Sequence, residues 1–351
     1  MSTTTHPALA ETVQKVRLLR RRRTTRRRWI LTAMTAVGIG LAAASVMVGQ
    51  VVYSPTEVLD VILGRDVPGA SFTVGRLRLP RTVLATVVGL SFGLAGVAFQ
   101  TMLRNPLASP DIIGISAGSS AAAAFAIVVL KLDGPLVSLL AILAGLVVAM
   151  LIYLLSISGG AAGTRLILIG IGLAAMLDAL TQYVLSQAGQ WDLQEAMRWL
   201  TGSLNGTTWA QTLPATAALL VLGPMLLLQS RNLNALQLGD DTANAIGTRV
   251  NLTRLVVVVA AVGLIAFATA ATGPIAFVAF LAGPIAARII GPNGSLLLPS
   301  ALVGAILVLI ADLAGQYWLG ARYPVGIVTG VLGAPYLLYL IVRTNRTANS
   351  L

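Results

Sequence analysis

Aspartates inside apolar stretches are the residues of this sequence most able to do chemistry. Asp178 and Asp312 interrupt long charge-free runs, and Asp111 stands at the end of another. An aspartate at the centre of a membrane helix costs about 2.5–3.5 kcal/mol on the insertion scale, so each needs a partner or a function. Three interpretations stay open: the proton site of a secondary transporter, the dyad of an aspartyl intramembrane protease, or a bundle-facing carboxylate that bonds neighbouring groups or reaches water.

Other catalytic and metal-binding chemistry lacks the residues it needs. The chain has no cysteine, and its one histidine, His6, lies in the polar N-terminal segment, away from every apolar stretch. A phosphate-binding loop needs a lysine after glycine, whereas Lys15 follows Gln14 and Lys131 follows Leu130. We therefore predict no catalytic residue, no metal site and no cofactor on this chain. If transport uses ATP, its magnesium complex is hydrolysed on another polypeptide.

The composition decides which elements must position these residues. Of 351 residues, 56% are hydrophobic and only 10% are charged, far below the roughly 25% of soluble domains. So few charges cannot cover a water-facing surface of this size, and the sequence predicts an all-α polytopic membrane protein. The net charge of +12 is concentrated between Lys15 and Arg28, which hold nine of the 24 basic residues. This run favours a cytoplasmic N-terminus and contact with anionic lipid headgroups over nucleic-acid binding.

About 20 apolar residues cross the hydrocarbon as a helix, and the chain offers ten stretches of that order. The proline in Gly273-Pro274 should separate two of them, because it removes a hydrogen-bond donor. An even count places both termini on the cytoplasmic side, which then carries seventeen of the 24 basic residues. We expect a basic tail at 1–28, a transmembrane domain at 29–343 and a C-terminal tail at 344–351. The predicted spans are 29–52, 82–103, 112–130, 134–158, 166–190, 212–230, 255–272, 274–287, 296–316 and 323–342.

Three polar segments separate the spans. Residues 53–81 form an outer segment that ends in a basic run, and residues 188–211 are predicted to hold a short interfacial helix. Residues 231–254 form the longest inner loop, where Asp240 can cap a short helix and Gly247 can end it. Small residues recur at helical spacing, and we expect them to serve close helix packing. These pairs are Gly89 with Gly93, Gly114 with Gly118, and Gly326 with Gly330.

Several strings of residues, in order over about 76–343, resemble the BtuC/FecCD family of permease subunits of ABC importers. Within that family the Gly-Ser-Leu-Asn-Gly and Gly-Asp-Asp-Thr-Ala strings most resemble the ferric-enterobactin type. The strings are Arg78-Leu-Pro-Arg81, Gln100, Arg104-Asn-Pro-Leu-Ala-Ser-Pro-Asp111, Gly114-Ile-Ser-Ala-Gly118, Gly202-Ser-Leu-Asn-Gly206, Leu238-Gly-Asp-Asp241, Gly273-Pro-Ile-Ala-Phe277, Pro324-Val-Gly326 and Gly333-Ala-Pro335.

The resemblance implies a type II importer fold with ten helices and a set of partners. These are a second permease, which the ferric-enterobactin likeness makes a sister chain, two cytoplasmic ATPases and an extracytoplasmic siderophore-binding protein. The implied location is the bacterial cytoplasmic membrane, and the implied cargo is a ferric siderophore. A bulky chelate also suits the spans better than bare ferric ion, which would want more hard oxygen ligands.

The resemblance also assigns roles to individual residues. Docking of the binding protein falls on Arg78 and Arg81, with Arg322 where many relatives have Glu. Gln316 stands where vitamin B12 permeases carry a third docking arginine, which makes vitamin B12 a poorer substrate. The cytoplasmic gate falls on Asn105, Leu107, Gly163 and Thr164. Coupling to the ATPase falls on 238–247, with Leu238, Gly239, Asp240, Asp241, Thr242, Ala245 and Gly247.

Overall fold

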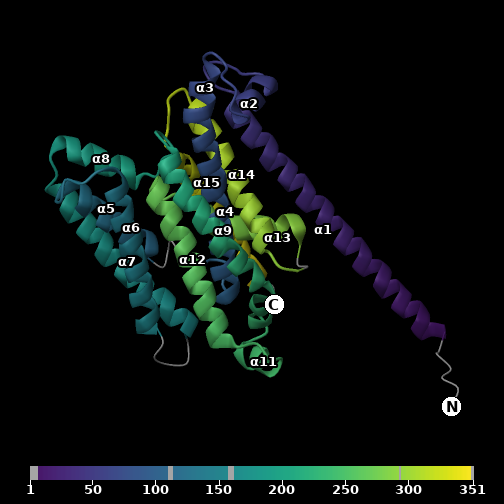
Figure 1. The fold of residues 1–351 in the computed structure, drawn as a ribbon. Helices are drawn as coiled ribbons and strands as arrows, with labels where there is room; N and C mark the ends of the chain where they lie inside the picture. The colour runs from purple at the N-terminus through teal and green to yellow at the C-terminus, as the bar shows by residue number, and fades with distance from the viewer. Residues whose placement is uncertain (1–6, 110–113, 157–161, 292–293, 349–351) are drawn as a thin grey trace.

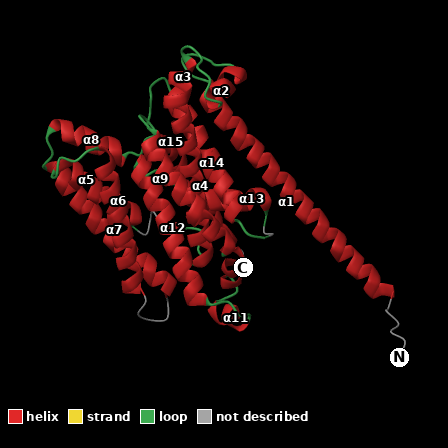
Figure 2. Cartoon of the chain, in the orientation of Figure 1, coloured by secondary structure: helices red, strands yellow, loops and turns green. Residues whose placement is uncertain are grey.

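The computed structural model describes residues 7–109, 114–156, 162–291 and 294–348, and these residues form helices and loops without a strand (Figure 2). Each of the ten predicted spans contains a helix. Seven helices are long and apolar enough to cross a membrane, and the apolar parts of α5, α13 and α15 are shorter. The ten are α1 (Pro7–Met47), α4 (Leu79–Met102), α5 (Ile115–Val128), α6 (Gly134–Ser156), α7 (Ala162–Ser186), α9 (Trp209–Leu228), α12 (Val250–Thr272), α13 (Val278–Ile290), α14 (Leu297–Leu313) and α15 (Val325–Ala348).

Short helices mark the two ends of the bundle. One end carries α2 (Pro55–Ile62), α3 (Ala70–Phe72) and α8 (Gln190–Leu200), and we call it the α8 end (Figure 1). The opposite end carries α11 (Asp240–Ala245), with α10 (Ser230–Leu236) before it in the chain, and we call it the α11 end. The basic part of α1 points toward this second end (Figure 1).

Two basic segments that precede predicted spans are helical. The N-terminal basic stretch continues without a break into the first span, because nothing between Pro7 and Met47 stops the helix. The basic run before the second span also lies on a helix. There α3 leads through a π-helical turn, η1 (Thr73–Arg78), directly into α4. The expected helix in 188–211 is confirmed as α8, whose Ala196 is buried while Trp191 is 84% exposed.

Helix α4 is the centre of the molecule, and most of its residues are buried. It packs against α14, α12, α13 and α9. The packing is close because α4 presents glycine to α14: a Cβ on Gly89 would lie 2.5 Å from the Cα of Ala305, and one on Gly93 would collide with the Ser300 carbonyl oxygen. Backbone contact of this kind is how small residues hold membrane helices together. The packing role expected for Gly89 and Gly93 is confirmed.

The predicted break at Gly273-Pro274 is confirmed. Helix α12 ends at Thr272, and Gly273 has a φ of 72°, which glycine adopts without a Cβ clash. Helix α13 begins at Val278, four residues later than expected, because Phe277 also takes a left-handed φ of 67°. Helix α14 continues at its far end into a second π-helical turn, η2 (Ala314–Trp318).

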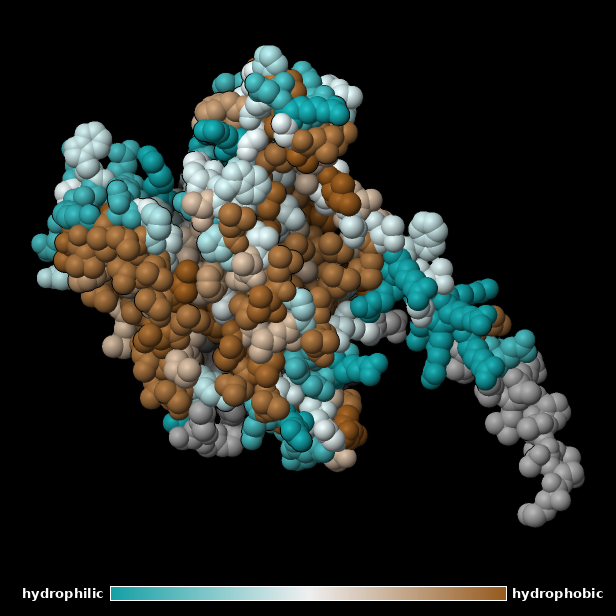
Figure 3. All heavy atoms as spheres, in the orientation of Figure 1, coloured by the Kyte–Doolittle hydropathy of each residue, from teal (hydrophilic) through white to brown (hydrophobic). Residues whose placement is uncertain are grey.

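The outer face of the bundle is apolar between its two polar ends (Figure 3). Exposed leucines follow one side of α6, among them Leu139, Leu143 and Leu154. Soluble proteins do not expose apolar area on this scale, whereas lipid tails cover it without cost. The chain is therefore a multi-pass membrane protein.

The first prediction concerns the contact of α4 with α14. Replacing Gly93 by Leu should force the two backbones apart, at a cost of about 1–3 kcal/mol or more, and lower the midpoint of thermal unfolding in detergent. The matched control is Gly40→Ala in α1, where no heavy atom lies within 4 Å of the added Cβ. Equal midpoints for the two variants would show that glycine packing does not hold α4 in place.

Candidate functional site

Residues 103–109, which contain the predicted gate residues Asn105 and Leu107 and which we call the gate segment, follow directly after α4 at the α11 end. Arg104 has a φ of 53°, a conformation uncommon outside glycine, and this turn ends the helix. The Asn105 amide N–H donates to the Gln100 carbonyl oxygen at 3.0 Å, and the Leu107 N–H donates to the Asn105 side-chain oxygen at 2.9 Å. Asn105 therefore shapes the turn that presents Leu107, which is 39% exposed.

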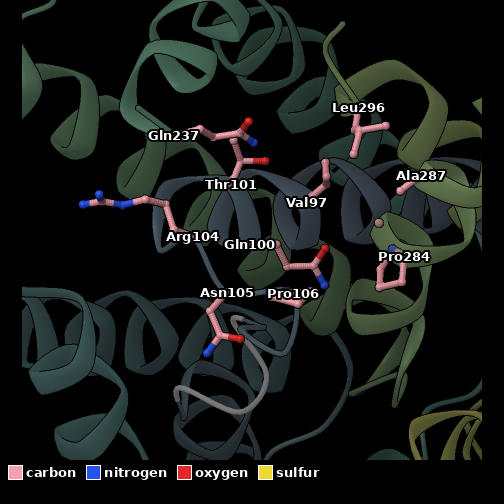
Figure 4. Close-up of a pocket in the computed structure, with 11 residues that line it drawn as sticks. Val97, Gln100, Thr101, Arg104, Asn105, Pro106, Gln237, Pro284, Ala287 and Leu296 are labelled. Atoms are coloured by element: carbon pink, nitrogen blue, oxygen red, sulfur yellow. The ribbon is translucent and has the colours of Figure 1, made fainter. Parts of the chain in front are cut away.

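A pocket of about 370 Å³ lies between the gate segment, α4 and α13 (Figure 4). Buried Gln100 lies on its α4 side and donates from its amide nitrogen to the Phe280 carbonyl oxygen at 3.0 Å. Asn105 and Pro106 line it from the gate segment, and Gln237 lines it from the loop before α11. The gate segment thus borders open space on one side rather than close-packed side chains.

Helix α11 lies between two glycines with left-handed or positive-φ backbones. Gly239, with a φ of 102°, precedes it, and Gly247, with a φ of 89°, follows it. The Gly247 N–H donates to the Asn244 carbonyl oxygen and the Thr248 N–H to that of Ala243, which is the hydrogen-bond pattern of a glycine-terminated helix. Gly247 therefore ends the helix as predicted.

The predicted cap at Asp240 is wrong. Asp240 is the first helical residue, and Gly239 before it makes no side-chain cap. The Asp240 carboxylate instead accepts from two arginines, Arg104 Nη2 at 3.0 Å and Arg254 Nη2 at 2.8 Å. The guanidinium groups compete successfully for the carboxylate because they carry full charges, whereas helix N–H groups carry partial ones.

The remaining predicted coupling residues form an outward surface. Ala243 is the buried residue of α11, whereas Asp241, Thr242 and Ala245 are exposed. Two large apolar side chains flank the helix, Leu238 at 63% exposed and Ile246 at 61% exposed. A six-residue helix is marginal by itself, so an exposed apolar pair beside it suits a partner protein.

A buried ion pair dominates the α8 end. Arg81, at the start of α4, donates from Nη2 to Asp312 at 2.7 Å and from Nε to both carboxylate oxygens. Gln316 donates to the same carboxylate at 2.8 Å, and Arg81 Nη1 reaches the Asn205 side-chain oxygen at 2.9 Å. Asp312 is 2% exposed, and this pairing explains how an apolar span tolerates it.

Arg78 is also engaged within the chain. Its guanidinium donates to the carbonyl oxygens of Val46, Met47 and Val51 and lies over the Tyr53 ring, 5.1 Å from the ring centroid. These carbonyls lie at and just beyond the C-terminus of α1, where the last groups of a helix lack partners. Arg322, by contrast, is exposed on the loop before α15.

The cap of α2 lies at this end as well. Ser54 and Glu57 form a reciprocal capping box at the start of the helix. Hydrogen bonds from Ser54 lower the pKa of the Glu57 carboxyl from its ordinary value. A lowered pKa means that the cap contributes above the ordinary pKa of the group and is lost as pH falls through the lowered one.

The other predicted residues lie apart from these two clusters. Asp178 is exposed on α7, while both oxygens of Asp312 are occupied by side chains of α4 and of the turn after α14, so the two aspartates form no dyad. Gly163 and Thr164 lie in the first turn of α7. Asp111 lies outside the described residues. Within the part of the chain that the structure describes, no three His, Asp or Glu side chains gather as a metal site.

Sequence reasoning missed the partners of the two paired aspartates. The family strings include Arg104 without a partner for it, no motif includes Arg254, and the resemblance assigns Arg81 to docking. The available signal was positional. Arg81 begins one span and Asp312 comes near the end of another of opposite direction, so antiparallel packing brings them to one level.

Comparison with known proteins identifies the class and the family. A solved structure described as an inward-facing conformation of a metal-chelate type ABC transporter matches with a TM-score of 0.80 and 28% identity, over 90% of this chain and 99% of that one. The fold is therefore that of an ABC importer permease. The model of the FecCD transport family matches residues 36–343, and the chain belongs to this family.

Two curated relatives cover nearly the whole chain. The ferric enterobactin transport system permease protein FepG of Escherichia coli (strain K12) is 37% identical over 91% of this chain and 98% of its own. The achromobactin transport system permease protein CbrC of Dickeya dadantii (strain 3937) is 38% identical over 87% and 88%. The cobalamin import system permease protein BtuC of Halobacterium salinarum is 31% identical over 78% and 74%.

The second prediction separates structure from docking at Arg81. Arg81→Glu should destabilise the fold by about 3 kcal/mol, because it leaves two carboxylates facing each other where a buried pair stood. The exchange Arg81→Asp with Asp312→Arg should recover part of that loss, and thermal unfolding in detergent measures both. If Arg81→Glu unfolds like the unchanged chain, the pair does not support the α8 end.

Proposed function

We propose that this chain is one membrane permease subunit of an ATP-driven importer that carries ferric siderophores across the bacterial cytoplasmic membrane. The supporting observation is that a chain of the FecCD family carries two sites at opposite ends. At the α11 end the exposed helix α11 is bound to the gate segment through Asp240 and Arg104, and at the α8 end lie Arg78 and Arg81. The α11 end then faces the cytoplasm with both termini, and the α8 end faces outward.

The partners follow from what the chain lacks and what it exposes. It has no phosphate-binding lysine motif, so ATP and magnesium belong to two cytoplasmic ATPase subunits seated on α11. The second permease is a sister chain, as the likeness to the enterobactin relative favours. The basic residues of α1 contact anionic lipid headgroups, and an extracytoplasmic siderophore-binding protein delivers the cargo.

The relatives support an iron chelate as the cargo class. Their names cover enterobactin and achromobactin, and others at 35% identity are named for Fe(3+)-citrate and iron(3+)-hydroxamate. The rival proton-coupled transporter has little support. Arg81 and Gln316 hold both carboxylate oxygens of Asp312, and Asp178 is exposed on α7 apart from that cluster.

The third prediction tests transport directly. A host strain that lacks this gene should lose uptake of at least one of three ⁵⁵Fe probes, ferric enterobactin, ferric citrate and ferrichrome, and regain it with the intact gene. Arsenate, which depletes ATP, should stop uptake, whereas a protonophore used with ATP maintained should not. Retained uptake of every chelate in the deletion strain, or a block by the protonophore alone, would contradict the proposal.

The fourth prediction concerns docking. We place Arg78, Arg81 and Arg322 on the docking surface, and Arg322 is the exposed charge available for a partner carboxylate. Arg322→Glu should slow association of the host's siderophore-binding protein several-fold at low salt, with a smaller effect as salt rises. The control is Arg65→Glu, because Arg65 is exposed at the same end but pairs with Asp60 of α2. Equal association rates for the two variants in biolayer interferometry would remove Arg322 from the surface.

A further inference from the structure

Arg104 stands at the junction between the central helix and the gate segment. It is the second residue beyond α4 and directly precedes Asn105, whose hydrogen bonds shape the turn. Its left-handed backbone is uncommon for a residue with a side chain and needs surrounding contacts to persist. Its guanidinium provides one, since it reaches Asp240 of α11, a residue 136 positions later in the chain.

The Asp240 carboxylate joins three elements at once. Its Oδ1 atom accepts from both Arg104 and Arg254 at 3.0 Å, and its Oδ2 atom accepts from Arg254 at 2.8 Å. Arg254 belongs to α12, so the trio connects α11, the gate segment and a membrane helix. Two arginines share one aspartate, and removal of its charge would leave two guanidinium groups in mutual repulsion.

We propose that Asp240 is a positioning residue that holds the gate segment to α11, so that movement of α11 is transmitted to Asn105 and Leu107. The movement of α11 rests on the proposed function, in which an ATPase binds to this helix. The ion pair that joins Arg104 to Asp240 is independent of that function. The adjacent Asp241 is exposed, and the two arginines bind Asp240.

The pocket beside the gate segment explains why an ion trio can act as the link. Asn105 and Pro106 line about 370 Å³ of space opposite Gln100 and Gln237 (Figure 4). A segment that borders a pocket can shift without displacing packed side chains. The contact between Arg104 and Asp240 crosses from this segment to α11, and it is therefore the constraint that fixes the two together.

The charges are partly solvated, which sets the size of the expected effect. The side chains of Arg104, Asp240 and Arg254 are 44%, 38% and 22% exposed. Single exposed ion pairs contribute little to stability, and networks of charges contribute more. Loss of this trio should therefore raise the accessibility of the gate segment about two- to fivefold. This is small against the stability of the bundle, and the variants should fold.

The experiment uses the absence of cysteine from the chain. Leu107→Cys gives one thiol on the gate segment, and its labelling rate by a water-soluble maleimide is measured on the assembled, nucleotide-free transporter. Asp240→Asn should raise the rate about two- to fivefold. Arg104→Gly should do the same, because glycine keeps the left-handed turn without strain and loses only the ion pair. Asp240→Glu keeps a carboxylate, and its labelling rate should be close to that of the chain with Leu107→Cys alone.

Two comparisons decide the result. Asp133→Asn makes the same chemical change at an exposed residue of the loop before α6, far from α11. It is the matched control and should leave the labelling rate unchanged. The double variant Asp240→Asn with Arg104→Gly should be no faster than either single change. The proposal is overturned if Asp240→Asn labels like Asp133→Asn, or if the double variant labels faster than both single variants. Should Asp240→Asn fail to assemble, Arg104→Gly alone gives the same decision.

A second measurement adds nucleotide. Addition of ATP with vanadate should change the labelling rate in the Leu107→Cys background, and this change should shrink when Asp240→Asn is present while ATP still binds. An undiminished change would overturn the transmission role. The labelling rates without nucleotide do not depend on which chelate is carried. If the uptake experiment contradicts the proposed function, these rates therefore still test whether Asp240 holds the gate segment.

Discussion

The structure depends on one constraint: hydrocarbon does not solvate a charge or an open backbone group. An aspartate in the last turns of α14 persists because Arg81 and Gln316 satisfy both of its oxygens. The carbonyls at the end of α1 are satisfied by the Arg78 guanidinium instead of water. Each such solution joins elements distant in sequence, so the polar groups that membrane insertion penalises are also the groups that tie the bundle together.

The same constraint explains why the two ends differ from the middle. Between the ends, helices approach through glycine, as where α4 meets α14 at Gly89, and lipid-facing leucines need no partner. At the ends, charges meet charges: Arg81 of α4 pairs with Asp312 of α14, and Arg254 of α12 pairs with Asp240 of α11. The apolar centre is therefore closely packed, whereas the ion trio at the α11 end lies beside a pocket bounded by Gln100 and Asn105.

Local patterns predicted the elements well, because they depend on neighbours in the chain. Gly273-Pro274 ends a helix in any environment, because glycine adopts a positive φ and proline lacks the backbone donor. Gly247 likewise ends α11 with a positive φ. The predicted start of α13 is four residues too early, because Phe277 has a left-handed backbone. An aromatic residue does not favour that conformation, so the sequence does not indicate it. The sequence places a basic tail before the first span, whereas α1 runs through both, because arginine favours helix.

The sequence by itself determined the class of the protein, its ten spans, the packing glycines Gly89 and Gly93 of α4, and the motifs that mark a FecCD permease. Only the tertiary structure decided what the charged residues do. Asp240 has the sequence context of a helix cap, yet it binds Arg104 and Arg254, and Arg81 has the context of an exposed docking residue, yet it binds Asp312. Helix ends and breaks are set by interactions within a few residues, whereas the partner of a charge is set by which distant helices pack side by side.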